Sequence, residues 1–114
     1  MNENKRLPEK FFDVLEHEGV VTVMSWGVEP HIVNTWNSYI VVTDDKRLLI
    51  PAYGFRKTEK NVNVNNKIKL ALGSIVTGTA RYISSGDEYE YMKKKFPFLT
   101  RVFEVTVDKA TQML

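Results

Sequence analysis

"HIVNTWNSYIVV", residues 31–42, is the stretch that decides the fold of this chain. Its two ends have the β-branched and aromatic residues of a buried strand. Side chains alternate between the two faces of a strand, so a half-buried strand should separate polar from apolar residues. This one does not, because its centre sets four small polar side chains around one tryptophan: Asn34, Thr35, Asn37 and Ser38 around Trp36.

Two interpretations of this polar centre stand side by side. In the first, its side chains present hydrogen-bond donors and acceptors to a flat heterocycle, with Trp36 or Tyr39 stacking on it or flanking it. In the second, the segment is a polar strand edge and Trp36 belongs to the core. Buried amides without partners cost about 1 to 3 kcal/mol each, so the polar centre of a buried strand favours a binding site.

The chain on either side of this stretch has the pattern of short strands joined by tight turns. Strands are predicted at residues 20–26, 31–43, 48–53, 68–76, 77–84 and 100–107. Short helices are predicted at residues 7–19, within 55–67 and at 86–97. Six strands with two or three short helices predict a mainly β fold, an antiparallel β-barrel whose openings the helices cap.

Residues 51–61, PAYGFRKTEKN, carry the strongest local signal for a ligand. Pro51 has no N–H for a sheet ladder, so it predicts an edge, a bulge or a strand end beside something other than a neighbouring strand. A flexible glycine, two adjacent cations and a hydroxyl that could cap a helix suit a phosphate at a helix start: Gly54, Arg56, Lys57 and Thr58. The alternative is a solvated turn of charges before a helix, the commoner role of an Arg-Lys pair. The spacing is not that of a nucleotide triphosphatase phosphate loop.

Length and composition limit the classes of protein to which the chain can belong. Its 114 residues fit a single domain, residues 1–114. No apolar run approaches the ~20 residues of a membrane span, and the first ten residues lack the apolar core of a secretory signal, so we expect a cytoplasmic protein. With no cysteine and only two histidines, no metal site is expected. The net charge of +2 argues against a dedicated nucleic-acid surface.

Four segments together resemble a known family: FFDVLEHEGVVTV, PHIVNTWNSYIVV, IPAYGFRKTEKNV and the terminal TQML. They resemble the small FMN-binding proteins of anaerobic bacteria, members of the pyridoxamine-phosphate-oxidase-like FMN-binding split-barrel superfamily. The resemblance runs over nearly the whole chain and is most specific in NTWNSY and in KTE.NV. It implies a six-stranded split barrel that forms a homodimer, with one FMN in each of two clefts at the subunit interface.

The resemblance also implies roles for individual residues. Lys57 and Thr58 match the phosphate-binding pair, with Arg56 nearby. The lining of the isoalloxazine and the ribityl chain matches one strand segment and the backbone of another: Asn34, Thr35, Trp36 and Asn37, then Pro51 and Ala52. Leu114 matches a residue that covers the flavin of the partner subunit. Where the family pattern has two adjacent glycines, this chain has Tyr53 and Gly54, which puts an aromatic ring close to the flavin edge.

No catalytic residue is expected, because no nucleophile pairs with a base and no two carboxylates suggest a glycosidase. Chemistry then belongs to the flavin, and the expected function is an electron carrier or a simple flavin-dependent reductase with an unidentified redox partner. Two alternatives stay open. One is a non-catalytic OB-like barrel for single-stranded nucleic acid, which the eleven Tyr and Phe residues would suit. The other is a split barrel that binds haem or a deazaflavin.

Overall fold

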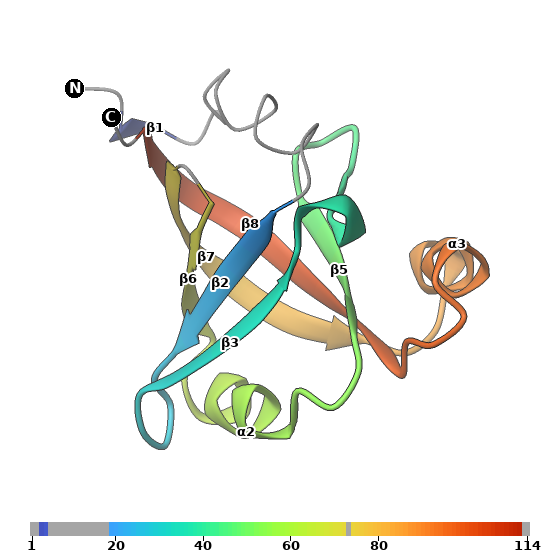
Figure 1. Cartoon of the computed structure of the whole chain (residues 1–114), viewed down its shortest axis with the longest axis horizontal. Coiled ribbons are helices and arrows are strands. Elements are labelled where there is room, and N and C mark those ends of the chain that lie inside the picture. Colours follow the sequence, from blue (N-terminus) through green and yellow to red (C-terminus); the bar gives the residue numbers. More distant parts are fainter. Residues whose placement is uncertain (1–2, 5–18, 73, 113–114) are drawn as a thin grey trace.

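One curled antiparallel sheet, wound as half of a barrel, forms the body of the protein in the computed structural model (Figure 1). The structure describes residues 3–4, 19–72 and 74–112. The strands are β1 (Glu3–Asn4), β2 (Val20–Ser25), β3 (His31–Trp36), β4 (Val41–Val42), β5 (Leu48–Ala52), β6 (Lys67–Ala71), β7 (Ser74–Ile83) and β8 (Arg101–Gln112). Together they cover the six predicted strands: β3 and β4 divide the one predicted at 31–43, and β1 is a two-residue addition. The mainly β, split-barrel prediction is therefore confirmed.

The order of the strands leaves one side of the half-barrel open. The sheet runs β3-β2-β6-β7-β8-β5-β4, with β1 paired to the far end of β8. The two end strands, β3 and β4, follow one another along the chain and are joined by η1 (Asn37–Tyr39), a single 3-10 turn. The open side of the sheet thus lies between β3 and the β4–β5 hairpin (Figure 1).

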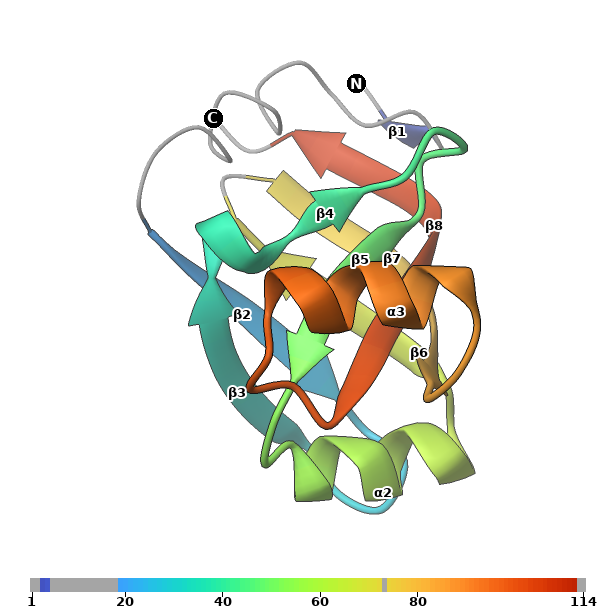
Figure 2. The ribbon, with the colours of Figure 1, turned by 90° about the vertical axis from the view of Figure 1, so that its right-hand side faces the viewer.

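Two helices pack against different surfaces of this sheet. Helix α2 (Arg56–Val64) lies across one end of the curl and contacts β2, β3 and β7. Helix α3 (Asp87–Lys95) lies outside the curl against β5 and β8 (Figure 2). Two hydrophobic cores result, one inside the curl around Phe103 and one between α3 and the outer side of β5 and β8 around Met92.

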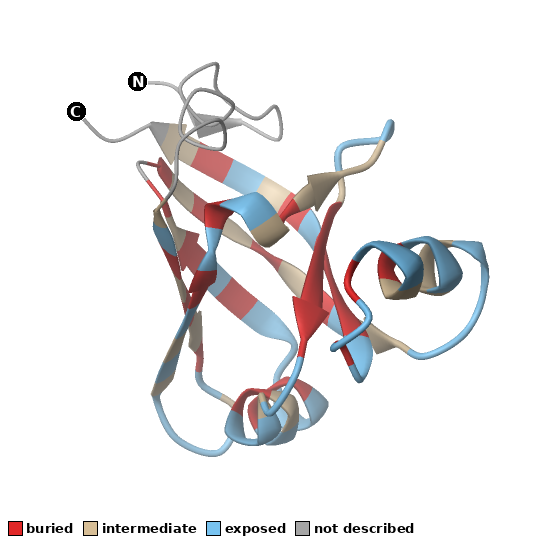
Figure 3. Ribbon diagram, turned by 45° about the vertical axis from the view of Figure 1, so that its right-hand side comes forward, coloured by how far each residue is buried: buried red, intermediate tan, exposed pale blue. Residues whose placement is uncertain are grey.

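Strand β5 is the one strand, among those whose burial is fully described, that is buried along its whole length, because the curled core covers one face and α3 covers the other (Figure 3). β4 pairs with it only at Leu48 and Leu49, whereas β8 pairs with it as far as Ala52. Pro51 therefore lies past the end of β4, where β5 has no second paired strand in the described structure. Of the predicted alternatives for Pro51, the edge is the one that the structure shows, on the β4 side alone, because Pro51 pairs with Val102 of β8 on the other side.

Two predicted strands are divided in the structure. The strand predicted at 31–43 stops at Trp36, because the backbone turns through η1 before β4 begins. The strand predicted at 68–76 ends at Ala71, and β7 starts at Ser74. The alternation of polar and apolar residues in 31–42 thus breaks at its centre because the strand ends at Trp36 and the residues that follow form the turn η1. The predicted helix at 7–19 lies almost wholly outside the described residues. Of the helices that the structure describes, neither α2 nor α3 is long and apolar enough to span a membrane.

Candidate functional site

An aromatic cluster brings the two predicted ligand-binding segments to the same part of the molecule. The ring of Phe98, which follows α3, lies 5.4 Å from the ring of Tyr39 at the end of η1. It also lies 5.1 Å from the ring of Tyr53, edge to face, just after β5. The polar stretch of β3 and η1 and the turn after β5 therefore converge on the open side of the sheet.

Strand β3 divides its polar residues between two faces. Asn34 and Trp36 point outward with Ile32, while Thr35 points inward and is buried. On the outer face Asn34 accepts a hydrogen bond of 3.0 Å from the hydroxyl of Thr22 on β2. The second interpretation, in which Trp36 belongs to the core, is wrong, since 43% of this residue is exposed.

Asn37 begins the 3-10 turn and is buried against the start of β2. Its backbone N–H donates to the carbonyl of Gly19 over 2.9 Å, and its own carbonyl accepts from the N–H of Ile40 over 3.1 Å. A Cβ on Gly19 would lie 2.8 Å from the side-chain nitrogen of Asn37. This close packing fixes the place where the chain leaves β3 and turns towards β4.

The turn after β5 offers less backbone to a ligand than the sequence suggested. The carbonyl of Ala52 accepts two hydrogen bonds from Thr100, 2.9 Å from its N–H and 3.0 Å from its hydroxyl. Carbonyls alternate between the two edges of a strand, so the carbonyl of Pro51 faces the other edge, where β4 has ended. Gly54 has φ of +70° and nothing within 4 Å of a built Cβ, so it is needed for its left-handed backbone and not for a close approach within the chain.

The first turn of α2 combines a helix N-terminus with two exposed cations. Arg56 and Lys57 are its first two residues. The first bond of the helix runs from the N–H of Glu59 to the carbonyl of Phe55, over 2.9 Å, so the N–H groups before Glu59 have no partner four residues back. The prediction that Thr58 caps the helix is wrong, because Phe55 occupies the cap position and Thr58 lies inside the first turn.

Two buried hydroxyls in these segments have no hydrogen-bond partner among the described residues. They belong to Thr35 on β3 and Thr58 on α2, and Thr58 is completely buried. Both residues lie on elements that contact each other, since α2 packs on β3. An unsatisfied buried polar group costs about 1 to 3 kcal/mol, so each calls for an explanation such as a ligand that supplies the missing partner.

Asn61 is a structural residue whose role the sequence did not reveal, although it is part of the KTE.NV motif. Its side-chain oxygen accepts from the N–H groups of Val28 and Glu29, at 2.7 and 3.3 Å. Its nitrogen donates to the carbonyl of Glu29 at 2.7 Å and to the hydroxyl of Ser25 at 3.0 Å. One buried amide thus fixes the β2–β3 turn to α2, and with it the position of β3.

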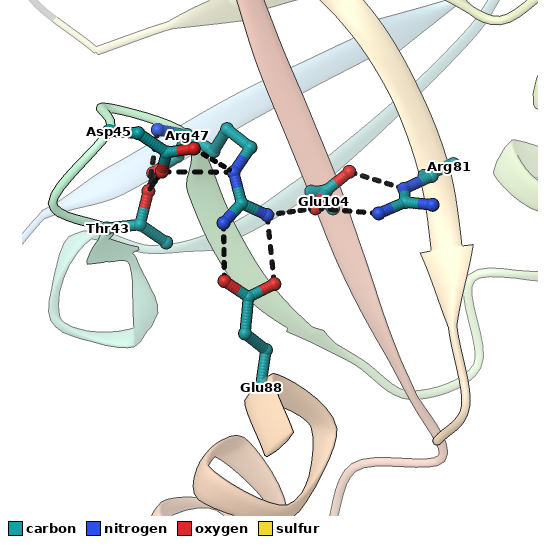
Figure 4. Close-up of polar contacts among 6 residues, drawn as sticks. All are labelled: Thr43, Asp45, Arg47, Arg81, Glu88 and Glu104. Carbon is teal, nitrogen blue, oxygen red and sulfur yellow. Dashed lines mark hydrogen bonds and ion pairs between the residues drawn. The ribbon is translucent and has the colours of Figure 1, made fainter. Parts of the chain in front are cut away.

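A second polar cluster lies on the outer side of β8 and is held by Arg47 (Figure 4). Arg47 pairs with Glu88 of α3 at 2.5 Å, with Asp45 at 2.9 Å, and with Glu104 of β8. Arg81 of β7 donates to the same Glu104 over 2.6 Å. These five residues are called the Arg47 cluster below, and they fix α3 and the β4–β5 hairpin to the sheet.

The charges of the Arg47 cluster shift one another's pKa values. Burial alone would raise the pKa of Glu104, but the hydrogen bonds from Arg81 and Arg47 outweigh burial and hold it below the ordinary value. The hydrogen bonds that Arg47 donates to Glu88 and, to a smaller extent, to Asp45 raise the pKa of Arg47. Both shifts favour the charged forms, so Glu104 and Arg47 stay paired near neutral pH.

The structure places all but one of the predicted site residues. Asn34, Trp36, Tyr53, Gly54 and the two cations of α2 are exposed, and Thr35, Asn37, Pro51, Ala52 and Thr58 are buried. Leu114, predicted to reach across a subunit interface, lies outside the described residues.

Comparisons with known proteins identify the family of this chain. The family model described as pyridoxamine 5'-phosphate oxidase matches residues 7–114. An "FMN-binding protein" of Nitratidesulfovibrio vulgaris is 36% identical over 122 residues, which cover 95% of this chain and 99% of the relative.

Solved structures share the fold. HupZ of Group A Streptococcus superposes with a TM-score of 0.82 at 19% identity, covering 95% of this chain and 94% of that one. An FMN-binding protein of Syntrophomonas wolfei superposes with a TM-score of 0.62 at 15% identity, covering 82% and 78%. With the family model and the curated relative, these findings show that the chain belongs to the pyridoxamine 5'-phosphate oxidase family.

Proposed function

We propose that this protein binds FMN on the open side of its half-barrel and serves as an electron carrier or a simple flavin-dependent reductase. The observation that carries the proposal is the 36% identity, along nearly the whole of both chains, with a protein named for FMN binding. The convergence of β3, η1 and the turn after β5 supports it independently, because a flavin needs a flat polar site next to an anion site.

The residues present suit such a ligand. The exposed Arg56 and Lys57 and the unpaired N–H groups of the first turn of α2 favour a phosphate. The buried hydroxyls of Thr35 and Thr58 lack partners that polar atoms of a ligand could supply. In this proposal Asn34, Asn37, Trp36 and Tyr53 line the ring, and the carbonyl of Pro51 replaces that of Ala52 as the backbone acceptor.

A bound flavin would supply the redox chemistry, taking up and releasing one or two electrons. The described side chains around the site include no histidine or carboxylate placed to move a proton: the carboxylate of Glu59 is paired with Arg101 at 2.7 Å. The role of the protein is then to bind the flavin ring, to orient it and to provide the hydrogen bonds and charges around it. This favours an electron carrier or simple reductase over an oxidase specific for one metabolite.

A homodimer is part of the proposal, and the outer face of β2 and β3 is where we place its interface. Three large apolar side chains are exposed there, with Val20 at 51%, Ile32 at 63% and Trp36 at 43%. Val20 pairs with Trp36 across the two strands, so they form one surface. Contiguous exposed apolar surface marks interaction sites. Sedimentation should show a dimer that Ile32→Asp converts to monomers; a wild-type monomer would contradict this part.

The phosphate grip is tested by comparing FMN with riboflavin, which lacks the phosphate. Lys57→Ala should weaken FMN about ten- to a hundredfold, since a charge-assisted contact contributes roughly 1.5 to 3 kcal/mol, and should leave riboflavin affinity little changed. Lys60→Ala, which removes an exposed cation from the next turn of the same helix, is the matched control. Equal losses for both ligands in Lys57→Ala would place the phosphate elsewhere.

A further inference from the structure

Residues 96–100, called the Phe98 loop below, run from the end of α3 to the start of β8 (Figure 2). The loop carries the ring of Phe98, which lies 5.4 Å from the ring of Tyr39 and 5.1 Å from that of Tyr53. These two residues belong to the two segments between which the flavin site is proposed. Phe98 is 46% exposed, so burial alone does not hold its ring in this place.

Lys93, in the last turn of α3, holds the backbone of the Phe98 loop. Its Nζ donates to the carbonyls of Pro97 and Leu99, both over 2.9 Å. These two carbonyls belong to the residues on either side of Phe98 in the chain. Hydrogen bonds from a charged donor are among the stronger ones in proteins, so the pair fixes the backbone that carries the Phe98 ring.

Thr100 anchors the other end of the Phe98 loop to β5. Its N–H and its hydroxyl both donate to the carbonyl of Ala52, over 2.9 and 3.0 Å. Tyr53 is the residue after Ala52, so this anchor also keeps Tyr53 next to Phe98. The loop is thus held at both ends, and it presents the exposed part of the Phe98 ring in one position.

Lys93 differs from the two lysines that follow it. α3 ends with three consecutive cations, Lys93, Lys94 and Lys95, and all three suit the negative end of the helix dipole. Lys94 and Lys95 are exposed, and neither donates to a carbonyl in the part of the chain that the structure describes. A contribution to the helix end is therefore common to all three, whereas the contact with the Phe98 loop belongs to Lys93.

We propose that Lys93 is a positioning residue of the flavin site, which keeps the ring of Phe98 in place as one wall against the isoalloxazine. The inference rests on the proposed function and deepens it, because Lys93 lies on α3 and acts through the Phe98 loop. A wall that is fixed before binding costs less free energy than a loop that the ligand must order. Because this wall contacts the ring system and not the phosphate, Lys93 should affect FMN and riboflavin equally, unlike Lys57.

The test is calorimetric titration of the wild type and its variants with FMN and with riboflavin. Lys93→Met keeps an unbranched side chain but removes the charge and the donors, and it should weaken both ligands by about the same factor, roughly three- to tenfold. Lys93→Arg keeps donors at this position and should restore most of the affinity. Lys94→Met is the matched control and should leave both affinities within about twofold of the wild type.

A double-mutant cycle shows whether Lys93 acts through Phe98. Phe98→Ala should weaken both flavins at least as much as Lys93→Met does. The double variant should bind no more weakly than Phe98→Ala alone, because the side chain that Lys93 positions is then already gone. Additive losses would overturn the proposal, as would unchanged affinities in Lys93→Met or a loss for FMN with none for riboflavin.

Amide spectra of the ligand-free protein separate this proposal from the flavin assignment. The signals of Phe98 and Leu99 should move far more in Lys93→Met than in Lys94→Met, whether or not a flavin binds. Moved signals in a protein whose wild type binds neither flavin would confirm that Lys93 holds the loop and refute the flavin site. Unmoved signals in a protein whose wild type binds FMN would refute the role of Lys93 and leave the proposed function standing.

Discussion

The Arg47 cluster and the open side of the sheet both gather polar groups against the barrel wall, yet their hydrogen bonding is opposite. In the Arg47 cluster the two arginines and three carboxylates bond to one another, and Glu104 is only 3% exposed. On the open side Thr35 and Thr58 are as well buried, and their hydroxyls bond to nothing in the described structure.

This difference separates structural polarity from functional polarity. A cluster in which every charged group has a partner needs no ligand, and the Arg47 cluster joins α3 to the sheet. A buried hydroxyl without a partner costs free energy that a closed structural cluster avoids. We therefore place binding on the open side and assign the Arg47 cluster to stability alone.

The largest expected effect follows from removing the charge at the centre of the Arg47 cluster. Glu104→Gln leaves Arg47 and Arg81 without their shared carboxylate and should lower the free energy of unfolding by about 3 kcal/mol, since hydrogen bonds to charged groups contribute roughly 1.5 to 3 kcal/mol each. Urea denaturation measures it. Lys67→Gln, which breaks the exposed pair with Asp108, should cost less than about 1 kcal/mol. An FMN affinity that fell with Glu104→Gln at full occupancy of the folded state would contradict the division between the two regions.

Acid should protonate Glu104 and lower the stability of the protein somewhat less than the Glu104→Gln substitution does. The pKa of Glu104 is lower in the folded chain than its ordinary 4.5, so its stabilising contribution is complete above 4.5 and is lost as the pH falls through the folded value. Melting temperatures recorded at decreasing pH should therefore drop more steeply below 4.5 in the wild type than in Glu104→Gln. Parallel curves would show that this carboxylate does not carry the acid sensitivity.

Asn61→Ala tests how the open side is kept in place. The change leaves the N–H groups of Val28 and Glu29 without their acceptor, and it should destabilise the protein by about 2 kcal/mol. Because Asn61 fixes the turn that leads into β3, FMN affinity should fall as well. Unchanged amide spectra for β3 in the folded variant would refute this positioning role.

The smallest effects should distinguish the two regions most clearly. Thr35→Val and Thr58→Val remove hydroxyls without partners, so stability should be unchanged or higher by up to about 1 kcal/mol, while FMN affinity falls. Thr43→Val is the matched control in the β4–β5 hairpin, because its hydroxyl bonds to Asp45 at 2.5 Å and to the N–H of Arg47 at 2.9 Å. It should cost about 1 kcal/mol and leave FMN binding intact. Equal destabilisation by all three substitutions would contradict the difference between unpaired hydroxyls on the open side and the paired hydroxyl of the hairpin.

Much of the fold was predictable because its signals are local. Alternating strands, the proline of β5 and the start of α3 near Gly86 can all be read within short windows. The 3-10 turn at Asn37 was missed, since a polar strand centre and a change of backbone direction give the same pattern. Asn61 and the Arg47 cluster could not be found this way, because their partners lie at least 32 residues away for Asn61 and 41 for the pair with Glu88.

The candidate site was predictable in its segments and not in its details. NTWNSY and the Arg-Lys-Thr turn are the segments that the fold brings to the open side, where the flavin site is proposed. The sequence could not show that Thr58 lies inside the first turn of α2 or that Thr100 donates to the carbonyl of Ala52. Each of these depends on how α2 and β8 pack.

The central claim, that the open side is a flavin site, is tested most directly by titrating the purified protein with FMN and recording the visible absorption spectrum. The proposal predicts perturbed flavin bands that saturate at one FMN per chain, with riboflavin bound more weakly. A spectrum that stays the sum of free FMN and protein at every ratio would contradict it.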